Sequence, residues 1–300
     1  MPNAKDAKDI GKPKFLLLGS TGSGKTAQIL TLPGKTFCYL FDPSALATLK
    51  GHDIDYELFL PTKVSTAAVS LSKGKSDPIK EEDASLLYVK WEKDSDERTK
   101  PDKKKYGIVK EEIFTPDNPD DPNIIEPKGQ WKEVERPACW FDQFDNICFD
   151  SFTTFSDMVM DRILKLNGRA GQFPQQDDWG GQMQTITNVV RTYASMNKIL
   201  LFTAHEEFKQ DKEGGKMQNM ILLTGRLRVK LPLLFSEMLH MECASTPAKI
   251  KYQIQTRPDR YNPAIRTTIK GLEMFHDVTI SDWTKPKDYG LGKLLRGTTK

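Results

Sequence analysis

The stretch Gly19-Ser20-Thr21-Gly22-Ser23-Gly24-Lys25-Thr26 decides the fold of this chain. It follows a short apolar run, Phe15–Leu18, typical of a buried strand, and precedes Thr26–Leu32, which can form a helix before Pro33-Gly34 stops it. Glycines let backbone N–H groups converge in a tight turn, and the first N–H groups of a helix have no internal partner. The pattern therefore predicts a phosphate-binding loop between strand and helix. A chance match in a Gly/Ser-rich turn is the alternative, and both flanks disfavour it.

The residue types within this stretch suit the phosphates of a nucleotide. Lys25 would reach the β- and γ-phosphates and take part in catalysis, and the Thr26 hydroxyl would ligate Mg²⁺. The expected nucleotide-binding residues are Ser20, Thr21, Gly22, Ser23, Gly24, Lys25 and Thr26. The sequence therefore predicts the core of a P-loop NTPase.

Composition predicts a globular protein without membrane contact. Of the 300 residues, 38% are hydrophobic and 28% are charged, and no apolar run approaches the ~20 residues that a membrane span needs. The polar start, residues 1–14, is unlike a secretory signal, and the four cysteines lack C-x-x-C spacing. We therefore expect a cytoplasmic location. Residues 205–300 carry 17 Lys/Arg against 11 Asp/Glu, which permits a polyanion partner without requiring one.

Strand-like and helix-like segments alternate after the loop. The expected elements are strands at 36–41 and 56–60 and helices at 45–50 and 64–71. This alternation predicts an α/β fold with a mostly parallel, wound sheet. We expect a disordered lead at residues 1–12, a core at 13–283 and a basic tail without core signal at 284–300.

The alternation breaks in residues 73–136, where 31 of 64 residues are charged. A disordered insertion is the plain interpretation of that composition. However, apolar and polar residues alternate at 87–91, and residues 106–109 and 131–134 are also strand-like. We therefore predict a partly ordered, β-rich insertion into the core.

The core resumes with a strand-like segment, 146–150, in which three apolar residues lead to Asp150. A carboxylate there would lie at the C-terminal edge of the sheet beside the phosphate-binding loop, where it can hold Mg²⁺ through water. Any buried strand can end in aspartate, so this assignment depends on the P-loop upstream. Asp150 is the second predicted metal residue, with Thr26.

The second half adds helices, strands and two polar loops. A helix after Asp150 has apolar residues spaced by three and four, which indicates core packing. The further expected elements are a polar loop at 167–178, a helix at 179–196, a strand at 198–204, a polar loop at 209–218, and strands at 220–224, 238–243 and 249–256.

This order of segments resembles the RecA-type recombinase core. It is most similar to the minimal phage-encoded ATP-binding proteins regarded as single-strand-annealing ATPases. The phrase Gln28–Lys35, the following strand ending at Asp42, and the Asp150-Ser151 ending carry the resemblance, which covers residues 12–283 without the insertion. It implies ATP and Mg²⁺ as cofactors, single-stranded DNA as partner, a homo-oligomeric ring or filament, and the host cytoplasm as location. A single-strand-binding protein is a further implied partner.

The family's functional positions fall on particular residues. Its two DNA-binding loops match 167–178 and 208–218, and its γ-phosphate sensor matches His205, for which a satisfied surface histidine is the alternative. Basic residues donated to a neighbouring subunit's ATP match Arg257 and Arg260, although a solvated hairpin turn is the simpler explanation. The implied DNA-contacting residues are Arg169, Phe173, Lys209, Lys212 and Lys216.

One position departs from the resemblance. In RecA-type enzymes a glutamate just beyond the second strand polarises the attacking water, and here Ser44 stands at that place. A serine hydroxyl is a poor base without an activating partner. Asp42 or Glu206 could take over, since a carboxylate needs only to reach the water directly or through another water. Otherwise the chain hydrolyses ATP slowly, because phosphoryl transfer depends mostly on positioning and charge.

Three functions remain open from the sequence. The first is an ATP-dependent single-stranded DNA binder that pairs or anneals strands in phage recombination. The second is another P-loop machine, such as a helicase loader or packaging motor. The third, favoured by Ser44, is a non-catalytic nucleotide-binding assembly protein. Oligonucleotide binding with and without ATP separates the first from the others, and an ATPase assay separates the second from the third.

Overall fold

The computed structural model describes most of the chain outside the charged insertion. The described residues are 11–42, 44–59, 91–92, 108–116, 129–169, 171–210, 215, 217–244, 246 and 250–297. Predictions for the lead up to residue 10, the helix at 64–71, and the side chains of Lys212 and Lys216 lie outside them.

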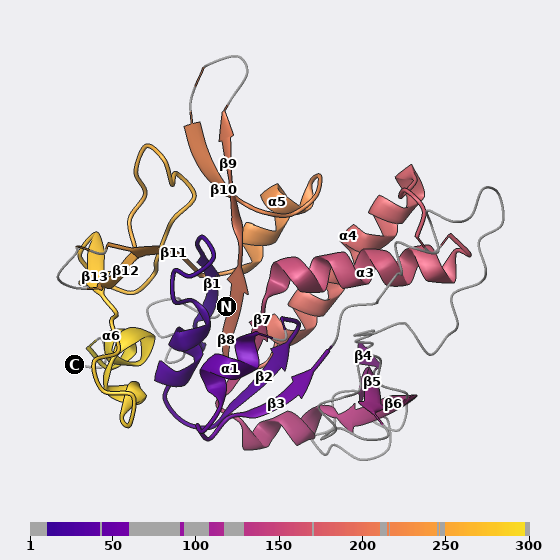
Figure 1. Ribbon diagram of the computed structural model, residues 1–300, viewed down its shortest axis with the longest axis horizontal. Helices are drawn as coiled ribbons and strands as arrows, with labels where there is room; N and C mark the ends of the chain where they lie inside the picture. The colour runs from indigo at the N-terminus through magenta and orange to yellow at the C-terminus, as the bar shows by residue number, and fades with distance from the viewer. Residues whose placement is uncertain are drawn as a thin grey trace, which may run out of the picture.

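An eight-stranded sheet forms the centre of the molecule, in the order β13-β12-β11-β1-β8-β7-β2-β3 (Figure 1). Its strands are β1 (Lys14–Leu18), β2 (Thr36–Leu40), β3 (Asp55–Leu58), β7 (Asn146–Asp150), β8 (Ile199–Ala204), β11 (Glu237–Cys243), β12 (Tyr252–Gln255) and β13 (Phe275–Asp277). The strands from β11 to β3 pair in parallel, and β12 and β13 add an antiparallel edge. This confirms the predicted α/β fold with a mostly parallel wound sheet.

The central strands are buried along their whole length because both faces of the sheet are covered. Every residue of β2, β7 and β8 is buried, as continuous apolar runs require in a parallel sheet. The pairing register aligns the C-terminal ends of these strands at one edge. The aligned pairs are Leu18 with Ala204, Phe149 with Phe202, and Leu40 with Asp150. The segments that follow β1, β2, β7 and β8 therefore meet at one edge, where wound sheets bind ligands.

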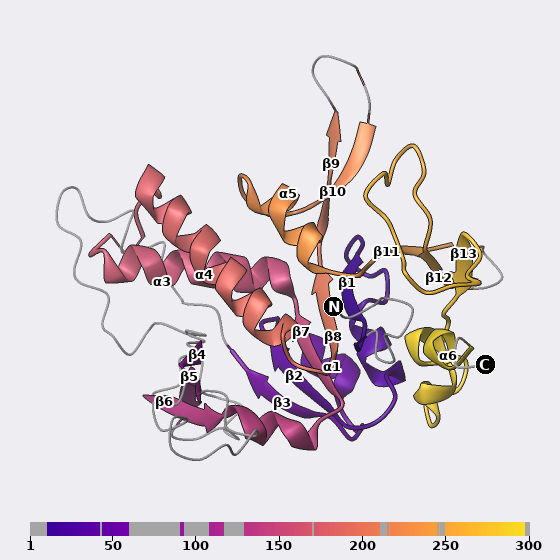
Figure 2. The same ribbon diagram turned by 180° about the vertical axis from the view of Figure 1, so that it is seen from behind.

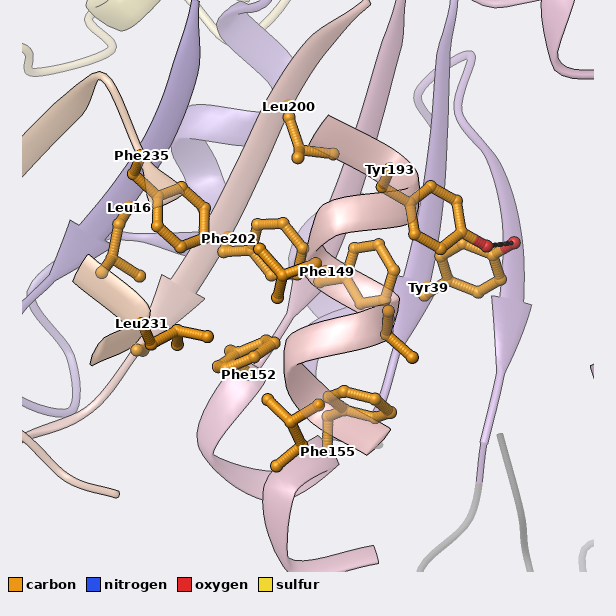
Figure 3. Packing of buried hydrophobic residues seen from close by; sticks show 14 of the residues in the cluster. Leu16, Tyr39, Phe149, Phe152, Phe155, Tyr193, Leu200, Phe202, Leu231 and Phe235 are labelled. Carbon is orange, nitrogen blue, oxygen red and sulfur yellow. Dashed lines mark hydrogen bonds between the residues drawn. The ribbon is translucent and has the colours of Figure 1, made fainter. Parts of the chain in front are cut away.

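The longest helices cover one face of the sheet (Figures 1 and 2). A core rich in aromatic residues lies between these helices and the sheet. The covering elements are η5 (Ala138–Gln143), α3 (Phe152–Leu166), α4 (Gln176–Ala194), α5 (Leu227–Lys230) and η6 (Leu231–Leu234). Phe149 stacks on Phe202 with ring centroids 4.4 Å apart, and the hydroxyls of Tyr39 and Tyr193 are 2.7 Å apart (Figure 3). The hydrogen bond between these buried hydroxyls satisfies both, so α4 is fixed on β2 without an orphaned polar group.

The opposite face is covered by η2 (Thr26–Thr31), α1 (Ala45–Leu49) and α6 (Gly290–Gly297), with η7 (Pro286–Asp288) before α6. The expectation that residues 284–300 have no core role is wrong. Leu291 is buried against η2, and a side chain at Gly292 would overlap the Thr31 backbone. This packing could not be predicted from the sequence, because the few apolar residues of the segment stand among basic residues and glycines.

Two smaller β units extend from the main sheet. Strands β4 (Trp91–Glu92), β5 (Ile108–Pro116) and β6 (Gly129–Pro137) form an antiparallel sheet, so the predicted β character of the insertion is confirmed where the chain is described. Strands β9 (Glu206–Gln210) and β10 (Met217–Ile221) form a hairpin that projects beyond the main sheet (Figure 1). The predicted loop at 209–218 is thus partly strand, because pairing between β9 and β10 overrides the polar composition.

Helix ends also differ from the predictions. Helix α4 begins at Gln176 instead of residue 179, because a reciprocal capping box joins Gln175 and Asp178. The first polar loop is correspondingly shorter. Among the described residues, no helix is long and apolar enough to cross a membrane.

Candidate nucleotide-binding site

The P-loop runs from the end of β1 to η2 and turns on glycines with positive φ angles. Gly19 has φ +156° and Gly24 has φ +88°. A Cβ at Gly19 would overlap the carbonyl oxygen of Met241, and one at Gly24 would lie 3.2 Å from the Tyr252 ring. Residues of the neighbouring strands therefore lie close to the loop, so that a side chain would overlap them at Gly19 and would be tightly crowded at Gly24. The predicted glycine turn between strand and helix is present, and its conformation suits the phosphate cradle that the sequence predicts.

Lys25 lies folded under the loop with only 6% of its surface exposed. Its Nζ donates to the carbonyl oxygens of Gly19 and Ser20, each at 2.8 Å. Burial lowers the pKa of Lys25, and the carboxylates of Asp150, Glu206 and Asp42 oppose this shift. A buried ammonium that loses hydration gains from any anion brought to the loop, so its setting fits a phosphate ligand.

Thr26, at the end of the P-loop, lies beside Asp150, the last residue of β7. The Thr26 hydroxyl donates to Asp150 Oδ2 at 2.8 Å, and the Thr203 hydroxyl donates to Asp150 Oδ1. Burial raises the pKa of Asp150, while these two hydrogen bonds counteract the rise. Hydroxyl and carboxylate oxygens are the hard ligands that Mg²⁺ prefers, so this donor set fits the metal that a P-loop site implies.

Two more predicted residues line the same cavity, which has a volume of about 770 Å³. Asp42 follows β2, and its Oδ1 accepts a hydrogen bond from the Thr154 hydroxyl at 2.6 Å. His205 follows β8, and its backbone N–H donates to the Thr153 hydroxyl at 3.0 Å. Burial, and then the charge of Lys25, lowers the pKa of His205 below its usual 6.5, so the imidazole is neutral at pH 7. Ser44 lines the cavity as well.

The two candidate bases occupy different places. Asp42 lines the cavity, whereas Glu206 is not among the described residues that do so. Glu206 Oε2 instead lies 2.9 Å from Nε2 of the buried His240. The structure therefore favours Asp42 over Glu206 as the carboxylate that can reach a water at the γ-phosphate.

Several residues at the site were not predicted from the sequence. Thr203 and Thr154 hydrogen-bond to Asp150 and Asp42, and each is a threonine in an apolar segment with no motif to mark it. The far wall of the cavity comes from the C-terminal part of the chain, through Ile250, Tyr252, Val278, Thr279, Ile280 and Trp283. Tertiary pairing of β12 with β11 brings this wall to the loop, and no local sequence pattern signals it.

Of the predicted DNA-contacting residues, the structure describes Arg169 and Phe173 on the loop before α4 and Lys209 on β9. Arg169 pairs with the fully buried Asp178, which Asn167 also bonds at 2.7 Å, so its guanidinium helps to hold the loop before α4. Phe173 is 95% exposed on that loop. Lys209 Nζ lies 3.1 Å from Glu207 Oε1 on β9.

A second cavity, of about 950 Å³, lies between α4, the hairpin and α5. Its wall includes Trp179, Lys209, Arg226 and Arg228, together with the acidic Asp157 and Glu207. Thr153, which bonds the backbone of His205, also lines it. The two cavities thus share one structural element, the chain around the end of β8.

Comparisons with known proteins agree with the P-loop assignment. The sequence model of the AAA domain family matches residues 11–266. No curated protein matches the chain. Among solved structures, the chain is similar to the flagellar accessory protein FlaH from Methanocaldococcus jannaschii, with a TM-score of 0.36 and 10% identity, covering 90% of this chain and 86% of that one. A likeness at this TM-score does not bear on function. The family match spans the P-loop, Asp150 and His205 and most of the chain, and the chain therefore belongs to the AAA domain family.

Proposed function

We propose that this AAA domain is an ATPase that binds single-stranded DNA in an ATP-dependent way and promotes strand annealing or pairing in phage recombination. The observation that carries the nucleotide part is the contact between Thr26 and Asp150 at 2.8 Å, beside the buried Lys25. The ammonium of Lys25 and the hydroxyl of Thr26 on the glycine loop, with the Asp150 carboxylate of β7 beside them, suit a magnesium-bound triphosphate. The resemblance to phage annealing proteins supplies the DNA part of the proposal.

Within the site, each side chain has a distinct task. Lys25 would exchange its two loop carbonyls for phosphate oxygens and stabilise the negative charge of the transferring group. Thr26 and Asp150 would hold Mg²⁺, which supplies charge neutralisation between the phosphates. Asp42 would accept a proton from, or orient, the attacking water. His205, neutral at pH 7, would donate a ring N–H toward the γ-phosphate.

Hydrolysis should be slow. Ser44 lines the cavity where RecA-type enzymes carry a glutamate, and Asp42 already accepts a hydrogen bond from Thr154. That bond occupies one carboxylate oxygen of Asp42 and leaves fewer positions from which the group can orient a water. Positioning and charge stabilisation remain, and these supply most of the catalysis in phosphoryl transfer.

The second cavity supports a DNA path near the ATP site. Trp179 is partly exposed and offers a ring on which a base can stack, and Arg226 and Arg228 offer cations for phosphates. The backbone of three consecutive residues, 205–207, joins the two cavities. His205 lines the nucleotide cavity, whereas Glu207 accepts a hydrogen bond from Arg228 at 3.1 Å. A γ-phosphate that shifts His205 would therefore bias the Arg228 contact, as phosphate contacts order switch segments in other NTPases.

Assembly into a homo-oligomeric ring or filament is part of this proposal. Arg257 and Arg260 are exposed, and they would act on a neighbouring subunit's ATP. A single-strand-binding protein is a further proposed partner. A non-catalytic assembly role is the second candidate, because Ser44 replaces the expected base.

A labelled single-stranded oligonucleotide, titrated at two salt concentrations with and without Mg-ATP, tests the proposal. We expect salt-sensitive binding that Mg-ATP tightens, and a loss of affinity in Arg226→Ala and Arg228→Ala but not in Lys50→Ala, a surface control. ATP hydrolysis without any DNA binding at low salt would point to another P-loop machine. Nucleotide binding without hydrolysis or DNA binding would point to the assembly role.

A further inference from the structure

The nucleotide cavity extends past the P-loop to a wall that no motif marks. This base-end wall consists of Ile250, Tyr252, Val278, Thr279, Ile280 and Trp283. It is mostly apolar, in contrast to the loop, and Ile250 and Trp283 are 61% and 49% exposed. Exposed apolar side chains at the mouth of a cavity that already fits phosphates indicate a surface for the rest of the nucleotide.

Tyr252 fixes this wall directly against the P-loop. A Cβ at Gly24 would lie 3.2 Å from the Tyr252 ring, so the ring touches the loop backbone. The Val278 N–H donates to the Tyr252 carbonyl at 2.9 Å, and the Tyr252 N–H donates to the Thr279 hydroxyl at 2.9 Å. The segment from Val278 onward is therefore held alongside β12, next to the place where a bound triphosphate would end.

Trp283 is presented by a turn that its neighbour stabilises. Asp282 Oδ1 accepts from the backbone N–H of Thr284 at 2.9 Å and from its hydroxyl at 2.6 Å, and these bonds lower the pKa of Asp282. The Lys285 N–H donates to the Asp282 carbonyl at 3.2 Å and closes the turn. Trp283 is thus half exposed on an ordered turn, which limits the entropy lost when a ligand stacks on it.

Gln28 ties the wall to the helix that follows the P-loop. Its buried amide donates from Nε2 to the Val278 carbonyl at 3.3 Å and accepts at Oε1 from the Leu291 N–H at 3.2 Å. One side chain of η2 therefore joins the segment before Trp283 to α6 after it. The C-terminal segment is part of the nucleotide site, and its position depends on the same short helix that carries Thr26.

We propose that the base-end wall binds the nucleobase, with Trp283 stacking on the ring and Tyr252 and Ile280 flanking it. This inference rests on the proposed nucleotide-binding function. Base–aromatic stacking depends on the π-face that every base has, so the wall should discriminate little between bases. The Thr279 hydroxyl is already engaged with the Tyr252 backbone, and Ile250, Val278 and Ile280 offer no side-chain hydrogen bonds. We therefore expect ATP and GTP to bind with affinities within about tenfold of each other.

The test compares Mg-ATP with Mg-tripolyphosphate, which carries the phosphates without base or sugar, by isothermal titration. Trp283→Ala should weaken the affinity for Mg-ATP about tenfold, as expected for the loss of one base–aromatic stack. The affinity for Mg-tripolyphosphate should stay within about twofold of wild type. Trp283→Phe should keep most of the ATP affinity. Tyr56→Ala, another partly exposed aromatic residue outside this cavity, is the matched control and should change neither affinity.

The outcomes separate this inference from the function on which it rests. Wild-type binding of both probes with an unchanged ATP affinity in Trp283→Ala would overturn the base site and keep the nucleotide assignment. An equal loss of both probes in Trp283→Ala would show that Trp283 supports the P-loop and does not contact the base. Failure of the wild type to bind either probe would overturn the nucleotide function itself. Thermal unfolding of each variant shows whether the substitution at the half-exposed Trp283, or at the control position, leaves the fold intact.

Discussion

The two ends of the nucleotide cavity are built in opposite ways. At the phosphate end, Lys25, Thr26 and Asp150 are charged or polar, largely buried and tied by hydrogen bonds of about 2.8 Å. At the base end, Ile250 and Trp283 are apolar and exposed, and Trp283 stands on a turn in which Asp282 bonds Thr284. The phosphate end would bind charged groups of the nucleotide through electrostatic interactions, whereas the base end offers a surface on which a ring can stack. Affinity should therefore depend steeply on the first end and gradually on the second.

The largest expected effect comes from Lys25→Ala. Loss of the ammonium should lower turnover about 10³-fold, as loss of a preorganised charge-stabilising donor does, and should weaken Mg-ATP and Mg-tripolyphosphate together. The fold should stay intact, because the Lys25 ammonium bonds carbonyl oxygens of its own loop and not the core of the sheet. ATPase assays and titration of both probes measure this, with Lys50→Ala as control. Retained tripolyphosphate affinity in a folded Lys25→Ala protein would contradict the role given to the phosphate end.

Asp42→Asn should have the next largest effect. If Asp42 orients or deprotonates the water, turnover from an already slow enzyme should fall about 10²-fold while both probes bind unchanged. Glu206→Gln is the matched control, because its carboxylate pairs with His240 instead of lining the cavity. A fast wild type, or a larger loss in Glu206→Gln than in Asp42→Asn, would assign the base elsewhere. Ser44→Glu is a further test, because a carboxylate at the position of the missing glutamate should raise the rate of ATP turnover.

Asp150→Asn should impair the Mg²⁺-dependent step about 10- to 100-fold, the range for loss of a residue that holds a metal through water. ATP binding without Mg²⁺ should change little. ATPase rates across a Mg²⁺ titration measure both. If Asp150→Asn hydrolyses ATP at the wild-type rate and with the wild-type Mg²⁺ dependence, Asp150 has no role in holding the metal.

The same variant has a predicted effect on stability. Burial raises the pKa of Asp150 above 3.8, so the stabilisation present below pH 3.8 is lost as pH rises through the raised pKa. Asparagine cannot ionise, so the unfolding free energy of Asp150→Asn should fall less between pH 4 and pH 7 than that of wild type. Urea unfolding at several pH values measures the difference. Parallel curves for the two proteins would contradict the burial argument.

The smallest expected effect comes from substitutions in the β9–β10 hairpin, outside both ends of the nucleotide cavity. Neutralising Lys209, Lys212 and Lys216 should weaken single-stranded DNA binding at every sequence and flatten its salt dependence by up to ~0.7 for each phosphate that is no longer neutralised. Nucleotide affinity without DNA should not change. Alanines at Lys50, Lys270 and Lys293, all exposed, provide a control of equal charge. An unchanged slope would remove the hairpin from the DNA path, a result that the pairing of Lys209 with Glu207 favours.

The contrast between the two ends also explains what sequence could predict. The phosphate end could be predicted because the P-loop is continuous and its strand and helix are adjacent in sequence, and Asp150 closes a recognisable apolar strand. Asp42 and His205 could be placed at the same edge because parallel strands align their C-terminal ends.

The rest depends on tertiary contacts between distant segments. Trp283 reaches the cavity only because β12 pairs with β11 and Gln28 bonds Val278, contacts separated by up to 250 residues. Helix α6 packs through Leu291 in a segment with the composition of a basic tail, and the β9–β10 hairpin forms from residues of loop composition. The pairing of Arg169 with Asp178 could not be predicted, because the sequence predicts a polar loop at Asp178, whereas this residue lies in the first turn of α4, which begins earlier than its apolar pattern indicates.

A crystal structure of the chain with Mg²⁺ and a non-hydrolysable ATP analogue tests the two-ended cavity most directly. We predict Lys25 on the β- and γ-phosphates, Mg²⁺ bound by Thr26 and reached through water by Asp150, and the adenine ring stacked on Trp283. A nucleotide bound with its phosphates away from Lys25, or with its base turned away from Trp283 into solvent or toward α1, would contradict the account at the corresponding end.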